Sequence, residues 1–583
     1  MVIDECREII IFGAGKNGKN AFEFIASEGF IVSSFCDNNT LLHGMNILGV
    51  PVWSLTDKEK LADKLIVIST AYSEAAKQLS NMGLENYTSF YLFKAKLEQR
   101  KIKQTASASK VQLSCDWILR NIHSGGLAVC SFEPASYPEV TGYTIPTMLQ
   151  YGFQKLALDM AEFLSKIQKP SGGFPSPEMK GEYYFDTAQA LRGLIAIGKI
   201  TRKYDACAEK AALFLFDAIG DGKTGFLSQY ATDIPESVHL FSLPPMLEWA
   251  HCVGNEFYIQ AVHNCVMHYL SDPETLRLST LTHFLAYQID GLIDLGYIKE
   301  AKEVLEKLLK TQQTDGVIPA FEGVDWVCLT GLAQIAICLY KMGIYQPADK
   351  IMNYLDEHQE LSGGFLGSIG EGAKYFPDRE ISWAVKFYLD AYRLRIKAFF
   401  EQNVSIFPEF INKGDGRILA IAKEIRDGDA IIEIGCGKGR ILKCLREQFS
   451  RSSFAALDIS PAMLRYVPDD LKKIEGCAEF IDCQSEIFDV VYSVEALEHS
   501  VNLSGAVNEI ARICKSGGKI IIIDKQLSEW GRMQCPPWES WPERKVLELM
   551  LGRHCDDVKS FPVMYEDSDK NDDLMIKWIG IKR

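Results

Sequence analysis

A glycine-rich turn in the last third of the chain is the clearest chemical signal in the sequence. The turn directly follows an apolar run. One acid and three glycines occupy every second position here: Glu433, Gly435, Gly437 and Gly439. Glycine lets the backbone approach a ligand closely, and the N–H groups that open the following helix can then face that ligand. Asp458 ends the next apolar run, where a carboxylate can accept both hydroxyls of a ribose. The pattern predicts a nucleotide-type cofactor, and alone it does not exclude a dinucleotide.

Ionisable side chains also stand where apolar helices of the middle region are expected to begin. They are Glu139, Asp186, His239, His283, Asp325 and Glu380. If these helices line a closed ring, they all begin at one end, so the groups meet at one rim of a central cavity. Carboxylates and imidazoles beside aromatic rings suit a carbohydrate, which makes Glu139, Asp186 and His283 candidate catalytic residues. Helix capping is the alternative for Asp186 and Asp325, but it does not explain the histidines or Glu139.

The N-terminal region carries a second glycine fingerprint. Gly13, Gly15 and Gly18 follow an apolar run, and Asp37 ends the next one, nineteen residues after Gly18. This spacing is typical of a nucleotide pocket and predicts a bound nucleotide or nucleotide sugar. A purely structural remnant of such a domain is the alternative. No Tyr-x-x-x-Lys sequence follows, which argues against a dehydrogenase.

The composition narrows the classes of protein. A chain of 583 residues is too long for one core, so several domains are expected. Its 77 acidic and 62 basic residues give a net charge of −15, which would repel nucleic acid. The N-terminus does not read as a signal peptide, and no apolar stretch approaches the about 20 residues of a membrane span. The 16 cysteines form no Cys-x-x-Cys pair, so we expect no metal site and a reducing, cytoplasmic location.

Three segments differ in apolar pattern and predict a multidomain protein. Residues 1–93 alternate strands and helices, which indicates a Rossmann-like α/β domain with a parallel sheet. A basic and then small, polar stretch at 94–110 predicts a linker. Residues 111–400 are helical and repeat with a period near 48. Residues 405–583 return to α/β alternation and close with a predicted β-hairpin.

The helical repeats fit either an open solenoid or a closed ring of six inner and six outer helices, the (α/α)6 toroid. An inner helix of a closed ring is buried on every side, and Val327–Leu339 is apolar nearly all round. This burial argument favours the ring. The segment resembles the toroids of glycosidases, uronyl epimerases, polysaccharide lyases and terpene cyclases, but it lacks the Asp-x-Asp-Asp acid of squalene-type cyclases.

Residues 410–583 resemble the class I S-adenosylmethionine-dependent methyltransferases. The glycine turn matches their first motif, Asp458 their ribose acid, and Leu497-Glu-His499 the end of the loop after their fourth strand. A closing antiparallel hairpin is also their hallmark. The resemblance implies an α/β class I methyltransferase domain in which S-adenosylmethionine contacts the glycine turn, Asp458 and three further positions: Ile459, Cys477 and Ala478.

Cys477 departs from the pattern of that family. The family often has an Asp at this position, where it contacts the adenine amino group. A thiol cannot fill that role well, so the resemblance implies Glu479 or Asp482 as the substitute.

The methyl acceptor requires a base if it is a hydroxyl, because the proton must leave as the methyl arrives. His499 is the first candidate catalytic residue and Glu495 the second, since both follow the fourth strand. Packing or capping of the following helix is the alternative for His499. Three tryptophans after the fifth strand predict either a lid that stacks on a ring-shaped acceptor or a small hydrophobic cluster: Trp530, Trp538 and Trp541.

These features predict an S-adenosylmethionine-dependent methyltransferase that acts on a glycan or nucleotide-linked sugar in polysaccharide biosynthesis. The N-terminal domain resembles small Rossmann-like modules that precede sugar-modifying transferases. The toroid is then a second catalytic or glycan-handling module. In the alternative, only the methyltransferase is catalytic, and the toroid and N-terminal domain present the acceptor. The sequence does not predict the oligomeric state.

Overall fold

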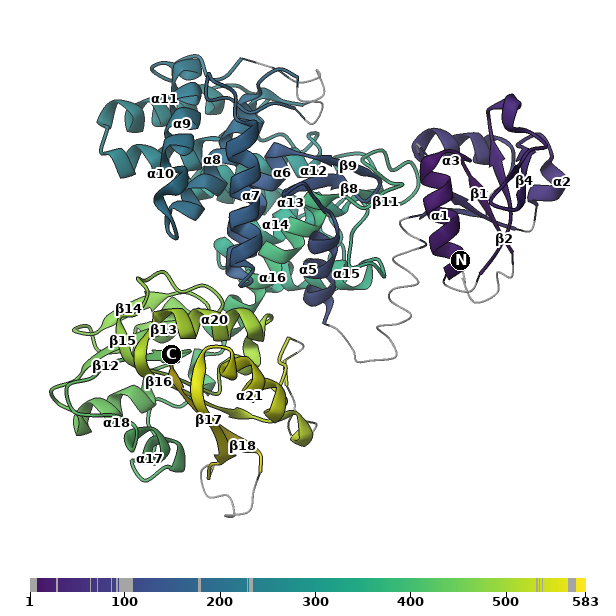
Figure 1. The fold of residues 1–583 in the computed structure, drawn as a ribbon. Coiled ribbons are helices and arrows are strands. Elements are labelled where there is room, and N and C mark those ends of the chain that lie inside the picture. The colour runs from purple at the N-terminus through teal and green to yellow at the C-terminus, as the bar shows by residue number, and fades with distance from the viewer. Residues whose placement is uncertain are drawn as a thin grey trace.

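The computed structural model describes residues 8–27, 30–62, 64–70, 72–84, 86–90, 93, 109–176, 180–227, 229, 234–530, 533, 535–536, 538–564 and 573–583. Within them the chain forms an N-terminal α/β segment, a helical segment and a C-terminal α/β segment (Figure 1). None of the helices among these residues is both long and apolar enough to cross a membrane.

The N-terminal sheet has the strand order β3-β4-β2-β1-β5-β6. Its strands are β1 (Glu8–Phe12), β2 (Ile31–Asp37), β3 (Asn46–Ile47), β4 (Val50–Ser54), β5 (Leu65–Ile68) and β6 (Tyr87–Ser89). β1 pairs in parallel with β2 and β5, as the predicted alternation of strands and helices requires. Separate hydrophobic clusters cover the two faces of the sheet, together with α1 (Lys16–Ser27), α2 (Lys58–Leu61) and α3 (Tyr72–Asn81). Most of the expected linker, residues 94–108, lies outside the described residues.

The helical segment begins with α5 (Lys110–Arg120) and short strands, and then consists of helical hairpins. The strands are β7 (Ile122–His123), β8 (Gly126–Cys130) and β9 (Glu133–Ser136), with the pair β10 (Val327–Cys328) and β11 (Ser368–Ile369) further along. The helices are α6 (Pro138–Gln150), α7 (Gln154–Ile167), α8 (Tyr184–Gly198), α9 (Asp205–Ile219), α10 (Leu243–Val253), α11 (Glu256–Leu270), α12 (Thr282–Asp294), α13 (Ile298–Leu309), α14 (Leu329–Lys341), α15 (Tyr345–Glu357) and α16 (Ser382–Gln402).

Contacts between these helices follow a regular order. They lead from α6 to α8, α10, α12, α14 and α16 in turn, and α16 also contacts α6. Hydrogen bonds join the first and last of these helices: Thr147 Oγ1 donates to Asp390 (2.6 Å) and Tyr151 Oη donates to the Leu389 carbonyl (2.8 Å). The intervening helices α7, α9, α11, α13 and α15 each pack on the helix before them, and α5 packs on α16.

Burial separates the two sets of helices. α14 is buried at every position from Leu329 to Tyr340, as expected for a helix with neighbours all round. The buried residues of α13 are instead confined to one stripe, Ala301, Val304, Leu305 and Leu308. The apolar pattern of the sequence therefore predicted correctly that α14 has no solvent-facing side.

The C-terminal sheet has the order β14-β13-β12-β15-β16-β18-β17. Its strands are β12 (Ala430–Ile434), β13 (Ser453–Asp458), β14 (Lys472–Glu475), β15 (Phe488–Val494), β16 (Cys514–Lys525), β17 (Cys555–Pro562) and β18 (Met575–Lys582). Strands β12 to β16 pair in parallel, and β17 and β18 form the predicted antiparallel hairpin. The helices are α17 (Gly416–Ala422), α18 (Arg440–Gln448), α19 (Pro461–Leu464), α20 (Leu503–Ile513) and α21 (Arg544–Gly552).

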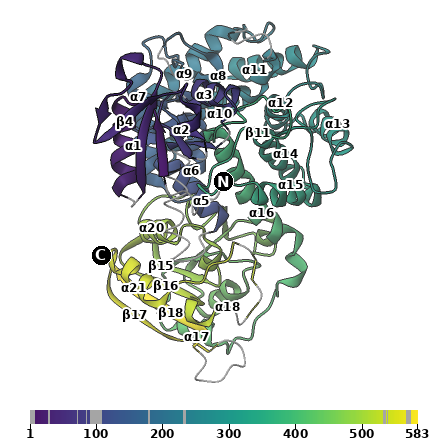
Figure 2. The same cartoon turned by 90° about the vertical axis from the view of Figure 1, so that its right-hand side faces the viewer.

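The helical segment packs against the C-terminal segment (Figures 1 and 2), and α16 contacts α19. Arg393 of α16 forms an ion pair with Glu479 at 3.2 Å, and both side chains are buried. One helical turn further, Lys397 pairs with Glu475 at 2.6 Å. Asn502 Nδ2 donates to the carbonyl of Tyr151, after α6, at 2.9 Å. The interface is therefore closely packed and polar.

Candidate active site

The glycine turn between β12 and α18 has a backbone that other residues rarely adopt. Gly435 and Gly437 have φ angles of 70° and 52°, in the left-handed region that favours glycine. A side chain on Gly435 would also clash with Ala496, whereas one on Gly437 would meet nothing within 4 Å. The close contact with Ala496, in the loop after β15, therefore requires a glycine at position 435. At position 437 the backbone conformation requires a glycine, and the space where a side chain would lie is open.

Asp458 faces this turn from the end of β13. Its Oδ2 accepts the backbone N–H of Gly437 (2.8 Å), and its Oδ1 accepts that of Ser460 (2.9 Å). Burial raises the pKa of Asp458 to about 6, although these N–H donors oppose the rise. A carboxylate offers about four lone pairs, so each oxygen can still accept a hydroxyl. The residue is therefore equipped to bind a ribose at neutral pH.

Glu433 lies beneath the turn and has a structural bond of its own. Its side chain is buried, and its Oε2 accepts the N–H of Leu442 in the first turns of α18 at 3.2 Å. Burial raises the pKa of Glu433 to about 8. Glu433 thus anchors the start of α18 as well as lining the cavity described next.

A cavity of about 450 Å³ opens beside the turn. This volume lies within the range of small-molecule sites. The cavity is lined by most of the residues expected to bind the cofactor, namely Glu433, Gly435, Gly437, Asp458, Ile459, Cys477 and Ala478. Gly439 is not part of the lining; its N–H bonds the Cys436 carbonyl at 2.8 Å and holds the turn closed. The open space at Gly437 and the remaining acceptor capacity of Asp458 fit S-adenosylmethionine.

The opposite wall of the cavity comes from the helical segment. Arg393, Ile396, Phe399 and Phe400 of α16 line it, followed by residues 407–408. The sequence did not predict these residues, because α16 reads as one more apolar helix and nothing local shows which domain its last turns face. Its length of 21 residues, greater than that of the other helices described here, was the available signal.

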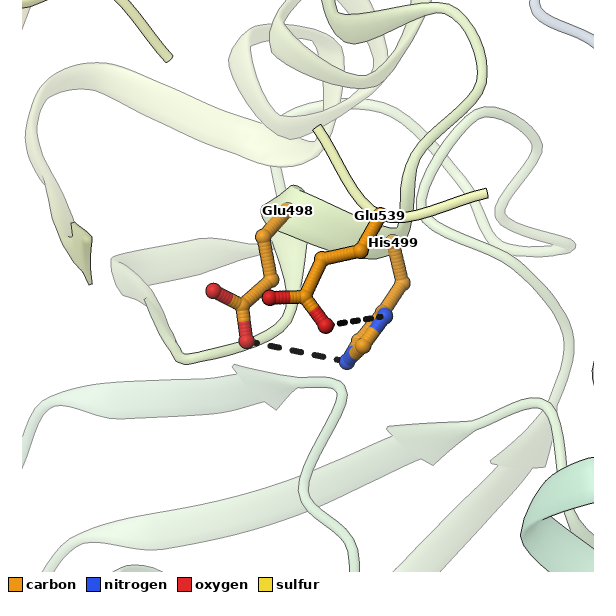
Figure 3. Close-up of side chains that lie close together, drawn as sticks. All are labelled: Glu498, His499 and Glu539. Carbon is orange, nitrogen blue, oxygen red and sulfur yellow. Dashed lines mark ion pairs between the residues drawn. The ribbon is translucent and has the colours of Figure 1, made fainter. Parts of the chain in front are cut away.

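His499 also lines the cavity, in the short helix η6 (Leu497–His499) after β15. Two carboxylates flank its ring: Nε2 lies 3.7 Å from Glu498 Oε1, and Nδ1 lies 4.0 Å from Glu539 Oε2 (Figure 3). The side chain is 20% exposed, and its Nδ1 has no hydrogen-bond partner. Burial lowers the pKa of His499 to about 4, so the ring is neutral at physiological pH. A neutral imidazole with a free nitrogen can accept a proton.

Lys525 supplies the charge that balances these carboxylates. Its Nζ lies 2.5 and 2.6 Å from the two oxygens of Glu498 and 3.8 Å from Glu539. Burial works against the charged ammonium, but Glu498 and Asp524 keep the pKa of Lys525 raised. Donor atoms of Glu498, His499 and Glu539 lie within 4.8 Å of one another, a set that could hold a metal ion. Lys525 already provides a cation to two of these three groups.

Glu495, the second candidate base, is committed to ion pairs. Its Oε1 pairs with the buried Arg417 and lies 3.3 Å from Arg440. Its backbone has a φ of 51°, an unusual conformation for a residue other than glycine. One of its oxygens is thus held by two guanidinium groups, whereas His499 Nδ1 has no hydrogen-bond partner.

The three tryptophans differ in exposure. Trp538 and Trp541 are buried; Trp538 packs edge-on against Phe399 of α16, and Trp541 Nε1 donates to Glu539 at 2.7 Å. Trp530 is 50% exposed and contacts Trp541 at 5.2 Å between ring centroids. Of the two sequence-based alternatives, these contacts match the hydrophobic cluster for Trp538 and Trp541. The cluster fixes Glu539, which the sequence did not single out, beside His499.

In the helical segment, Glu139 and His283 both lie beside Tyr287. Glu139 lies in the first turn of α6, where burial raises its pKa to about 7, while the neighbouring hydroxyls of Tyr137, Tyr287 and Tyr143 oppose the rise. The ring of His283 lies 4.6 Å from that of Tyr287. Burial lowers the pKa of His283 to about 4, and its Nδ1 lies 2.5 Å from Gln334 Oε1.

Two of the other expected rim residues share neighbours with this pair: Tyr137 lies beside both Glu139 and Asp186, and the Phe185 ring contacts those of His239 and Tyr287. Asp186 is buried and accepts a hydrogen bond from Tyr137 Oη at 3.3 Å. His239 lies in η4 (Glu236–Phe241), and its Nδ1 is 3.2 Å from Ser242 Oγ. Glu380 accepts hydrogen bonds from Trp117 and Ser362, which tie α5 to the start of α16. Asp325 is exposed in the loop before β10.

The N-terminal sheet repeats the arrangement seen at Asp458. Asp37, at the end of β2, accepts the N–H of Ala14 in the glycine turn at 2.7 Å and that of Asn39 at 2.8 Å. In the turn, Gly13 has a φ of 103°, and a side chain on Gly18 would clash with the Gly13 carbonyl. The turn and the acid are therefore joined as in a nucleotide pocket.

Comparison with known proteins shows which family the C-terminal segment is similar to. Residues 432–522 match the family model described as a methyltransferase domain. An uncharacterized protein of Methanocaldococcus jannaschii is 29% identical over 134 residues, which are 22% of this chain and 51% of that protein. The sterol 24-C-methyltransferase of Pneumocystis carinii is 30% identical over 109 residues, 17% of this chain and 29% of that enzyme. The phthiotriol/phenolphthiotriol dimycocerosates methyltransferase of Mycobacterium leprae is 28% identical over 112 residues, 18% and 42% of the two chains.

One solved structure shares a weak similarity with part of this chain. The crystal structure of a SAM-dependent methyltransferase from Archaeoglobus fulgidus is 16% identical, covers 28% of this chain and 91% of that one, and has a TM-score of 0.25. The chain spans about half or less of the length of the first curated relatives that it matches. The glycine turn and Asp458 both lie within the matched residues 432–522. The C-terminal segment is therefore a class I, S-adenosylmethionine-dependent methyltransferase domain.

Proposed function

We propose that the whole protein transfers a methyl group from S-adenosylmethionine to a hydroxyl of a small acceptor. The observation that carries this proposal is the shared cavity: Asp458, the glycine turn and His499 line the same space. Bound there, S-adenosylmethionine supplies a methyl group on a sulfonium, which transfers by in-line displacement once the acceptor is aligned. The protein's own residues must then bind the ribose, align the acceptor and remove its proton.

His499 is the proposed base. Its ring is neutral and flanked by the carboxylates of Glu498 and Glu539. When the acceptor hydroxyl gives up its proton to the imidazole, these carboxylates stabilise the imidazolium that forms. Lys525 bonds both oxygens of Glu498 and lies 3.8 Å from Glu539, which holds the two carboxyl groups beside the ring. The packing around Trp541 holds Glu539 in place.

A glycan or nucleotide-linked sugar in polysaccharide biosynthesis is the proposed acceptor. Its support is the mixture of surfaces in the cavity: the rings of Phe399, Phe400 and Phe407 beside the charged groups of Glu498 and Lys525. A sugar presents an apolar face and a polar rim, and such a surface suits both. For the N-terminal sheet we propose a nucleotide or nucleotide sugar, supported by the bond between Asp37 and the glycine turn.

Titration calorimetry with S-adenosylhomocysteine, the product form of the cofactor, tests the proposal on the intact chain. We expect one binding site per chain and, with methyl-labelled S-adenosylmethionine, label in the small-molecule acceptor found by mass spectrometry of the reaction. Absence of S-adenosylhomocysteine binding would refute the assignment of the cavity. Binding without transfer to any hydroxyl compound would refute only the acceptor class.

The helical segment is proposed to be a closed (α/α)6 toroid that acts as a second, glycan-handling module. The return contacts from α16 to α6 support closure, and the cluster of Glu139, Tyr143, Tyr287 and His283 supports a site. A carboxyl group with a pKa near 7 can donate or accept a proton at neutral pH. The alternative remains that only the methyltransferase domain is catalytic and the helical segment presents the acceptor.

Glu139→Gln separates these alternatives, because an amide keeps the size and hydrogen bonds of Glu139 but cannot exchange the proton. If the helical segment is catalytic, its turnover of a glycan should fall by about 100-fold or more, measured by mass spectrometry of the products. His283→Ala should have a similar effect. Thermal unfolding should stay unchanged in Glu139→Gln, and S-adenosylhomocysteine affinity should stay unchanged in both variants. Loss of stability alone, with glycan binding and turnover intact, would identify a scaffold.

A further inference from the structure

The imidazole of His499 is not held by a hydrogen bond within the part of the chain that the structure describes. Its Nδ1 has no hydrogen-bond partner, and its Nε2 lies 3.7 Å from Glu498, which is beyond the length of a hydrogen bond (Figure 3). A catalytic histidine usually owes its orientation to a group that bonds its second ring nitrogen. For His499, packing therefore has to orient the ring.

Phe400, in the last turn of α16, provides a packing contact of this kind. Its ring centroid lies 5.1 Å from that of His499, and the two ring planes meet at 77°. This edge-to-face arrangement is one that aromatic pairs prefer. Both side chains also line the cofactor cavity. A side chain of the helical segment therefore packs on the candidate base of the methyltransferase domain.

Phe400 is itself held by neighbouring aromatic rings. Its ring packs against those of Phe399 and Phe407, with centroids 5.3 and 5.7 Å away. Phe399 in turn packs edge-on against Trp538 of the methyltransferase domain at 5.2 Å. The ring that contacts His499 thus belongs to a row of packed aromatic side chains, which limits its own movement.

Two ion pairs fix this part of α16 against the methyltransferase domain. Arg393, Lys397 and Phe400 follow one another at intervals of four and three residues, so they share one face of the helix. Arg393 pairs with Glu479 at 3.2 Å, and Lys397 pairs with Glu475 at 2.6 Å. The position of Phe400 relative to His499 is therefore set by an interface with polar contacts one and two helical turns away.

Rotation of the imidazole would slow proton transfer. The χ2 torsion of histidine has broad energy wells, so a ring without restraint points its nitrogens in a range of directions. A base has to aim its nitrogen at the acceptor hydroxyl, and a misplacement of about 1 Å can cost about 100-fold in rate. A ring packed edge-to-face against the imidazole restricts this rotation, because turning either ring breaks the contact or makes the rings overlap.

We propose that Phe400 is a positioning residue for methyl transfer, whose ring holds the imidazole of His499 in the orientation that accepts the proton of the acceptor. The helical segment then contributes to catalysis in the methyltransferase domain through His499. This inference rests on the proposed role of His499 as the base.

A double-mutant cycle tests whether Phe400 acts through His499. Initial rates with methyl-labelled S-adenosylmethionine are compared in the wild-type protein, Phe400→Leu, His499→Gln and the double variant. Leucine keeps an apolar side chain but lacks the flat ring. We expect kcat to fall by about 10- to 100-fold in Phe400→Leu, while KM for S-adenosylmethionine changes by less than about twofold. In the His499→Gln background the same substitution should change kcat by less than about twofold, because the residue that it positions is already absent.

Phe410→Leu is the matched control, because Phe410 is 79% exposed and is not part of the described cavity lining. Its kcat should equal that of the wild-type protein. An equal fall of kcat in both backgrounds would overturn the inference, since Phe400 would then act independently of His499. Unchanged kcat in Phe400→Leu, with or without a loss of affinity for S-adenosylhomocysteine, would overturn it too. A His499→Gln variant that keeps full kcat would instead refute the proposed base, and this inference with it.

A crystal structure of the wild-type chain gives a readout that needs neither an acceptor nor a folded variant. We expect the His499 ring to take one orientation, packed on Phe400, and to take more than one in a structure of Phe400→Leu. Two orientations of the ring in the wild-type protein would contradict the positioning role, as would one unchanged orientation in the variant.

Discussion

Replacing His499 with Gln should lower kcat for methyl transfer by about 100- to 10,000-fold, the usual contribution of a general base. Gln is close to His in size and polarity, so the packing beside Phe400 and the flanking Glu498 and Glu539 should persist. It cannot accept a proton from a hydroxyl at neutral pH. Initial rates with methyl-labelled S-adenosylmethionine measure the loss, and calorimetry should show unchanged affinity for S-adenosylhomocysteine.

His251→Gln is the matched control, because His251 is exposed at the end of α10, far along the chain from the cavity. Its kcat should equal that of the wild-type protein. A His499→Gln variant that keeps full kcat would show that the ring only packs against Phe400, whose ring centroid lies 5.1 Å away. Loss of cofactor affinity in that variant, with kcat retained, would instead assign His499 to binding.

The pH profile offers a second readout of the same residue. Burial lowers the pKa of His499 to about 4, so the base is already deprotonated throughout the neutral range. Wild-type kcat should therefore not fall through protonation of His499 until the pH approaches about 4. A titration of kcat with a midpoint near the ordinary imidazole value of about 6.5 would contradict a buried, neutral base.

Replacing Asp458 with Ala should weaken S-adenosylmethionine binding by about 100-fold, or about 3 kcal/mol, because two charge-assisted hydrogen bonds to the ribose are lost. Calorimetry on the intact chain measures the change. Unchanged affinity would refute the assignment of Asp458. Asp37→Ala provides the contrast: it alters the corresponding carboxylate of the N-terminal sheet, and a loss of affinity there instead would move the cofactor to that sheet.

The same carboxylate predicts the pH dependence of binding. The pKa of Asp458 is raised to about 6 in the free protein, mainly by burial. Above that pH the group is ionised and accepts both hydroxyls; below it, protonation removes acceptor capacity. Affinity for S-adenosylhomocysteine should therefore be greatest above about pH 7 and decrease as the pH falls through 6. The Asp458→Ala variant should lose this dependence.

The parts of the fold that the sequence predicted are those that depend on residues close together in the chain. The apolar runs that precede the two glycine turns form β1 and β12, because short apolar runs between turn residues favour strands. The final antiparallel hairpin also agrees, since strands so close in sequence cannot pair in parallel. The burial of α14 followed from a helix that is apolar all round.

The cofactor side of the candidate site was predictable for the same reason. Gly435 and Gly437 have positive φ angles within a few residues of the strand end, and Asp458 ends the neighbouring strand. Each position depends on its own element and on the pairing of adjacent strands. His499 likewise follows β15 directly.

Other residues of the site depend on contacts between distant parts of the chain. Arg393 and Glu479 are 86 residues apart in the sequence, and Glu539 reaches His499 from the loop after β16. The tryptophans around Glu539 were predicted to form either a lid or a hydrophobic cluster. The choice depends on packing against α16, which buries Trp538.

The amino-acid sequence by itself therefore determined the methyltransferase domain, its glycine turn, its ribose acid and its candidate base, because local backbone conformation and strand order create them. Only the tertiary structure decided that α16 of the helical segment closes the cavity with Arg393 and Phe400. It also decided that Glu539 and Lys525 surround the base. The physical reason is that these side chains come together only when the two segments pack against each other. The free energy of that packing is spread over many residues, which leaves no local pattern in the sequence.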